Sequence, residues 1–136
     1  MKKEKHDEIL KEVLDEIEAA SKDSNGLVSH QRRLAFLLSL GAETLLELYF
    51  HKQDIIKEGS RIDHRWFKKR KENVLKKVQD NITSQVKSIK NIDEIINKMR
   101  EIEEKRDDLA YGAPATEDIL QEKINLFFEL KKLIKC

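Results

Sequence analysis

The sequence predicts an all-α fold, an up-and-down bundle of about five helices that form a single domain over residues 1–136. The composition of this 136-residue chain favours helices, because Leu, Ile, Lys and Glu dominate and only one proline and four glycines interrupt it. Apolar residues recur at helical spacings of three and four along most of the chain. No stretch alternates in polarity as a half-buried strand does.

The most apolar stretch, residues 34–50, reads LAFLLSLGAETLLELYF and organises the predicted bundle. It is apolar nearly all round, which is typical of a helix buried by its neighbours. We expect this helix to begin at the candidate cap Ser29 and to end near Lys57. The apolar run is too short, and too interrupted by glutamates, to span a bilayer. Gly41 lowers helix stability relative to alanine, which is consistent with a close approach of another helix.

Apolar stripes at helical spacing predict four more helices, at residues 4–21, 64–89, 91–110 and 116–134. The residues predicted to cap them are Asp63 for helix 64–89, Asn91 with Glu94 in a capping box for helix 91–110, and Thr116 for helix 116–134. The connections between these helices are short, as an up-and-down bundle requires.

The charge balance excludes a general attraction to nucleic acid, because 27 basic residues face 26 acidic ones. No apolar segment follows Met1 closely, so no signal peptide is predicted. The single cysteine, Cys136, cannot form an internal disulfide. We therefore expect a cytoplasmic protein with no membrane association.

Arg106 is the most informative residue of the sequence. The stripe of the predicted helix 91–110 comprises Ile92, Ile95, Met99, Ile102, position 106 and Leu109. Arg106 therefore falls on the buried face, where an arginine is unfavourable unless it is paired. We expect its side chain to be largely buried and hydrogen-bonded to Asp107, Glu43 or Glu47, or to the same cleft of a second chain. The alternative is a structural arginine in an ion pair at a fraying helix end.

Residues 103–115, EEKRDDLAYGAPA, carry a resemblance to a known family. The five-helix pattern, with an apolar second helix and RDDLAYG at the end of the fourth, resembles the HEPN superfamily of small α-helical domains. Members of that family have an arginine, usually a polar residue after it, and a histidine four to six residues further on. Arg106 and Asp107 match the first part, but Tyr111 stands where the histidine is expected.

The resemblance covers about residues 29–134 and implies several functions. Members with the full motif are commonly metal-independent ribonucleases, and others are non-catalytic binding or toxin–antitoxin partners. They often dimerise with the motif at the interface. No histidine follows His64 in this chain. A tyrosine is a poor general base, because a phenol titrates far above neutral pH.

Three functional hypotheses follow from the sequence. The first is a non-catalytic HEPN-like interaction module that forms a homodimer and binds RNA, a nucleotide or a partner protein through a cleft around Arg106. The second is a metal-independent ribonuclease with Arg106, Asp107 and Tyr111 as catalytic residues, helped by His64 or His51 from another helix. The third, which the resemblance alone implies, is a structural partner subunit of a nucleotidyltransferase or of a toxin–antitoxin pair.

The segment 61–77, RIDHRWFKKRKENVLKK, is strongly basic, with eight Lys and Arg residues against two acidic ones. Aromatic residues beside a basic run are compatible with base stacking and phosphate contacts. The candidate nucleic-acid-binding residues are Arg65, Trp66, Lys68, Lys69 and Lys71. The alternative is a solvated helix face whose aromatic residues turn into the core.

No metal or cofactor is predicted. Glu47 and His51 stand four residues apart on the central helix, as metal ligands do. A dimetal bundle would need repeated Glu-x-x-His pairs, which the chain lacks. No glycine-rich phosphate loop and no arrangement typical of a covalent nucleophile is present.

Overall fold

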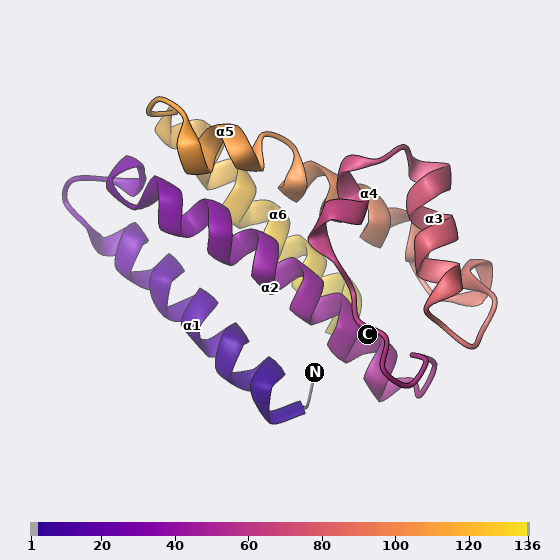
Figure 1. Ribbon diagram of the computed structural model, residues 1–136. Helices are drawn as coiled ribbons and strands as arrows, with labels where there is room; N and C mark the ends of the chain where they lie inside the picture. The colour runs from indigo at the N-terminus through magenta and orange to yellow at the C-terminus, as the bar shows by residue number, and fades with distance from the viewer. Residues whose placement is uncertain (1–2, 136) are drawn as a thin grey trace.

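The computed structural model describes residues 3–135 and confirms the all-α bundle (Figure 1). Its α-helices are α1 (Lys3–Lys22), α2 (Gln31–Lys52), α3 (Lys71–Asp80), α4 (Ile92–Glu103), α5 (Arg106–Tyr111) and α6 (Glu117–Lys135). Three 3-10 helices lie between them, η1 (Leu27–His30), η2 (His64–Lys68) and η3 (Val86–Ser88). The helices pack together as a bundle around α2, and within the described residues there is no strand, only an isolated bridge between Ile56 and Ile82.

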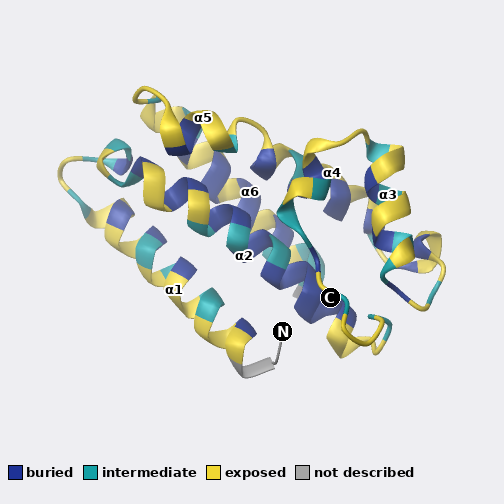
Figure 2. Ribbon diagram, viewed as in Figure 1, coloured by how far each residue is buried: buried dark blue, intermediate teal, exposed yellow. Residues whose placement is uncertain are grey.

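Helix α2 is the centre of the bundle, as its apolar sequence predicts, but Ser29 does not cap it and it ends at Lys52 rather than near Lys57. It forms an antiparallel hairpin with α1 and also packs against α5 and α6 (Figure 1). Most of its residues are buried, whereas α1 exposes one face along its length (Figure 2). Gly41 allows the close approach inferred from the sequence, because a Cβ atom there would lie 2.7 Å from Cε1 of Phe127 and 3.2 Å from Val13.

The 3-10 helix η1, which leads into the central helix α2, is held by a residue that is distant in the sequence. The carboxylate of Glu117, in the first turn of α6, accepts hydrogen bonds from the backbone N–H groups of Leu27 (2.8 Å) and Val28 (2.9 Å). N–H groups at a helix start have no partner within their own helix. Gly26 is required beside this contact, because its φ is +85° and a Cβ atom would lie 2.5 Å from a carboxylate oxygen of Glu117.

The segment Leu27–Lys52 is long and apolar enough to cross a membrane, judged by length and composition alone. The apolar run 34–50 was predicted from the sequence to be too short to span a bilayer. The helical segment that contains it, Leu27–Lys52, is longer than that run. However, 72% of its most apolar window is buried inside the bundle. The core helix of a soluble protein passes the same test, so this segment is weak evidence for a membrane span.

The prediction of one helix over residues 64–89 is wrong. The chain forms η2, an extended link at Lys69 and Arg70, then α3, a turn and η3. The side chain of Gln79 fixes the turn, because its Nε2 donates to the carbonyl of Ser84 and its Oε1 accepts from the N–H of Val86. Such side-chain bonds to the backbone compete with helix continuation. The apolar residues at helical spacing in this segment are nevertheless buried, namely Phe67, Val74, Val78, Ile82, Val86 and Ile89. The predicted cap Asp63 does accept from the N–H of Arg65, at the start of η2.

The prediction of one helix over residues 91–110 is also wrong, because α4 ends at Glu103 and α5 begins at Arg106. Lys105, between them, has a left-handed backbone with φ of +63°. The predicted capping box at Asn91 does not form, since Asn91 is itself left-handed and its side chain makes no cap hydrogen bond. Asparagine adopts that conformation more readily than most residues. The predicted cap Thr116 is confirmed, because its Oγ1 accepts from the N–H of Ile119.

Candidate functional site

Arg106 lies at the start of α5 with a side chain that is only 14% exposed. Its guanidinium donates to Oδ1 of Asp107 at 3.0 Å, which is one of the partners expected from the sequence. Its Cζ lies 4.9 Å from the centre of the Phe36 ring, within range of a cation–π interaction. Its Nε lies 4.0 Å from Oε1 of Glu103 and has no hydrogen-bond partner among the described residues.

Glu103 is a buried carboxylate that joins three elements beside Arg106. Its Oε2 accepts from the hydroxyl of Ser39 on α2 at 2.7 Å. Its Oε1 lies 2.7 Å from Nδ1 of His64 on η2. Glu103 was not predicted from the sequence. It lies four residues after the buried Met99 and three before Arg106, a spacing that places the three residues on one face of a helix.

Tyr111 is 72% exposed and contacts the other predicted site residues only indirectly. Its ring packs edge-on against the ring of Phe36, with centroids 5.8 Å apart. Phe36 is therefore the residue that both Arg106 and Tyr111 touch, and it is 38% exposed itself. Sequence reasoning missed Phe36 because it belongs to the apolar run of α2.

A cleft of about 560 Å³ opens beside Arg106. The residues that line it are Phe67, Lys68, Asn97, Arg100, Glu101, Glu103, Glu104, Lys105, Arg106, Asp107 and Asp108. Four of these are basic and five are acidic, and no histidine of the described chain is among them. Lys68 donates to Oδ2 of Asp107 at 2.7 Å, so the basic segment and the predicted motif meet at this cleft.

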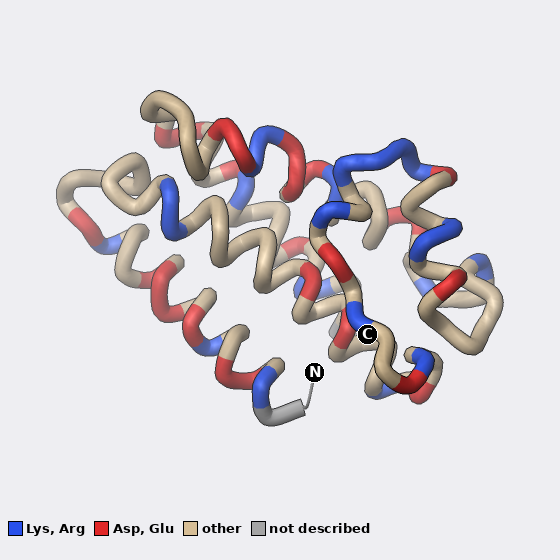
Figure 3. Tube along the Cα trace, viewed as in Figure 1, with Lys and Arg blue, Asp and Glu red and all other residues tan. Residues whose placement is uncertain are grey.

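The basic segment runs along the chain through η2 and the extended link and into α3 (Figure 3). Its charges are divided among η2, the extended link and α3. Ion pairs hold three of the predicted nucleic-acid-binding residues, Arg65 with Asp63, Lys68 with Asp107 and Lys71 with Asp93. The hydrogen bond from Arg65 lowers the pKa of Asp63 to about 2. Trp66 is half-buried and packs against the core, and only Lys69 of the predicted set exposes a side chain with no ion pair described for it. These contacts favour the alternative of a solvated surface.

The expectation that Glu43 or Glu47 pairs with Arg106 is wrong. Glu43 accepts from the backbone N–H of His64 at 2.6 Å, and burial raises the pKa of Glu43. Glu47 accepts from the backbone N–H of Ile62 at 3.1 Å and lies 2.7 Å from Nε2 of His6. Both glutamates therefore hold the chain that enters η2, and Glu47 also belongs to a separate cluster with His6 and His51 toward the end of α2.

Comparisons of the chain with models of protein families, with curated proteins and with solved structures found no match. The resemblance to the HEPN superfamily therefore stays a prediction from the sequence.

Proposed function

We propose that the protein is a non-catalytic, HEPN-like interaction module that forms a homodimer through the surface of Phe36, Arg106 and Tyr111. The observation that supports this most is that Arg106 lies over the ring of Phe36, which in turn packs against Tyr111, and that both aromatic rings stay exposed in the single chain. Aromatic residues and arginine are enriched at the centres of protein interfaces, where they contribute most of the binding free energy.

The charges of the Arg106 cleft favour a protein partner over RNA or a nucleotide. Lys68 and Arg106 both pair with Asp107, and the cleft is lined by more acidic than basic residues. A phosphate would have to displace these ion pairs, and it would meet the repulsion of the remaining carboxylates. A second copy of the same chain brings the same balanced charges and the same exposed aromatic residues.

The dimer is tested with the double variant Phe36→Ala, Tyr111→Ala. We expect the unmodified protein to have the mass of a dimer in light scattering at micromolar concentration. The loss of one hot-spot residue costs about 2 kcal/mol or more, which is about 30-fold in affinity, so the double variant should dissociate more than about 30-fold more readily. The matched control is Phe128→Ala, because Phe128 has the same 38% exposure as Phe36 but lies on α6. A monomeric unmodified protein, or equal weakening by the control, would contradict the proposal.

A specific contact favours the ribonuclease as a second candidate. Oε1 of Glu103 lies 2.7 Å from Nδ1 of His64 and 4.0 Å from Nε of Arg106, so one carboxylate connects a histidine from η2 to the motif arginine. His64 does not line the Arg106 cleft itself, so to act as the general base that Tyr111 cannot provide it would have to turn toward a phosphate bound beside Arg106. Arg106 could then stabilise the charge that develops on a phosphate.

The ribonuclease is tested by incubating purified protein with single-stranded RNA in EDTA. Under our first proposal we expect no cleavage above the buffer control. Cleavage that disappears in both Arg106→Ala and His64→Ala would instead support the enzyme, and cleavage that survives in both would indicate a contaminating nuclease.

A further inference from the structure

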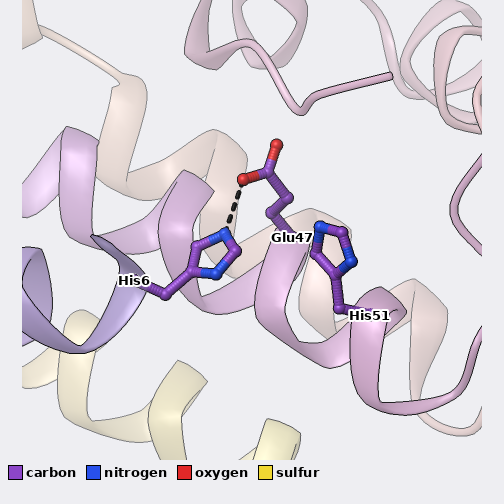
Figure 4. A group of neighbouring side chains, drawn as sticks. All are labelled: His6, Glu47 and His51. Atoms are coloured by element: carbon purple, nitrogen blue, oxygen red, sulfur yellow. Dashed lines mark hydrogen bonds and ion pairs between the residues drawn. The ribbon is translucent and has the colours of Figure 1, made fainter. Parts of the chain in front are cut away.

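Three side chains from two helices converge at the end of α2, away from the Arg106 cleft (Figure 4). His6 comes from α1, and Glu47 and His51 lie one turn apart on α2. Nε2 of His6 is 2.7 Å from Oε2 of Glu47. One ligand atom from each of the three residues lies within 4.8 Å of the other two. We propose that His6, Glu47 and His51 form a zinc-binding site that joins α1 to the end of α2.

The donor set matches the chemistry of zinc. Two imidazoles and one carboxylate are a combination that binds Zn²⁺ at open sites, where water takes the fourth position. Nitrogen and oxygen donors of this kind do not suit Ca²⁺ or Mg²⁺, which prefer sets made of oxygen alone. His51 is exposed, so the fourth position would face solvent.

The geometry needs only small movements to hold the ion. Zinc bonds of about 2.0–2.1 Å in a tetrahedron place the ligand atoms about 3.3 Å apart. The pair formed by His6 and Glu47 is slightly closer than this, as expected of a hydrogen bond where no ion separates the two groups. His51 must move inward, and an exposed side chain at a helix end can do so. The other carboxylate oxygen of Glu47, Oε1, accepts a hydrogen bond from the N–H of Ile62. This bond orients the carboxylate, as hydrogen bonds to metal ligands commonly do in metal sites.

A second observation distinguishes this cluster from an ordinary buried ion pair. His6 is fully buried, yet its Nδ1 has no hydrogen-bond partner in the described chain. In Figure 4 the ring edge that carries both nitrogens of His6 faces Glu47 and His51. A histidine kept only for stability would be expected to satisfy both nitrogens, because an unsatisfied buried polar atom is unfavourable. Nδ1 of His6 is therefore without a partner among the described residues, while Nε2 already lies against the carboxylate that would share the ion.

The sequence alone does not show this site. Glu47 and His51 have a ligand spacing, but the third ligand lies 41 residues earlier in the chain and only the hairpin of α1 and α2 brings it close. The zinc site is independent of the proposed dimer surface, because Phe36 lies near the other end of α2.

The test is a titration of the full chain with zinc chloride, after treatment with EDTA and removal of the chelator. Cys136 is replaced by serine in every protein so that its thiol cannot bind the ion. We expect one zinc ion per chain in isothermal titration calorimetry, and a melting temperature that rises with zinc concentration and returns when EDTA is added. Co²⁺ in the same site should give the intense visible absorption of four-coordinate cobalt.

The decisive variant is His51→Ala, because His51 is exposed and its removal should leave the fold intact. We expect the zinc affinity to fall at least tenfold, the cobalt absorption to disappear and the melting temperature in EDTA to stay unchanged. His64→Ala is the matched control, since His64 pairs with Glu103 outside the cluster and its variant should retain the affinity. Absence of stoichiometric binding, or equal affinities for the two variants, would overturn the zinc site and leave His6 and Glu47 as a buried pair.

Discussion

Replacing Glu103 by alanine is expected to lower the free energy of unfolding by about 3 kcal/mol or more. The carboxylate is buried, and its loss leaves Ser39 and His64 without their partner and removes the counter-charge beside Arg106. Removal of one member of a buried charge pair typically lowers stability by about 3–5 kcal/mol, because the remaining charge is left uncompensated. Urea denaturation followed by circular dichroism measures the change.

The neighbouring residue provides the control for this experiment. Glu104 has the same charge and is exposed, so Glu104→Ala should change the stability by no more than about 0.5 kcal/mol. Glu103→Gln keeps the volume and can still accept a hydrogen bond, so its effect should lie between the two. If Glu103→Ala and Glu104→Ala were equally stable, Glu103 would not organise the site as its contacts indicate.

Replacing Phe127 by alanine is expected to lower the free energy of unfolding by about 3–5 kcal/mol. Phe127 is fully buried on α6 and its ring fills the space over Gly41 of α2. The adjacent Phe128 is 38% exposed, so Phe128→Ala should have a much smaller effect and serves as the control in the same denaturation experiment.

The contact between Phe127 and Gly41 also makes the two positions non-additive. Gly41→Ala alone should destabilise the protein by about 1–3 kcal/mol, because the new methyl group overlaps the Phe127 ring. In the Phe127→Ala background that overlap is absent and only the contact with Val13 at 3.2 Å remains, so alanine at position 41 should destabilise the protein less there than in the unmodified chain. Additive effects in this cycle would show that the two helices are further apart than described.

The sequence predicted the long helices well and the short ones poorly. Apolar spacing identified α1, α2 and α6 because each buries one continuous face through many turns. The same spacing over residues 64–89 identified the buried residues but not the path of the chain. A series of short helices and turns buries the same side chains, and the bonds from Gln79 that produce this path cannot be recognised from spacing.

The candidate site was predictable only in part for a related reason. Arg106 and Asp107 stand out from their neighbours, and the structure places them together beside Lys68. Glu103, Phe36 and His6 could not be singled out, because the contacts that make them notable join residues far apart in the sequence. The burial of Arg106 was inferred correctly from a stripe, although the helix assumed to carry that stripe is broken at Lys105.

The contact of Glu117 with Leu27 and Val28 has a consequence for how the protein is made. A ribosome synthesises the central helix long before it reaches Glu117, which lies 90 residues beyond Leu27. Until Glu117 is synthesised, the backbone N–H groups of Leu27 and Val28 in η1, which leads into that helix, can therefore bind only water or transient partners. The 3-10 helix η1 should stay frayed on the nascent chain until the start of α6 emerges, although the hairpin of α1 and α2 can already form. A single carboxylate 90 residues downstream thus couples the order of η1 to the synthesis of the first turn of α6.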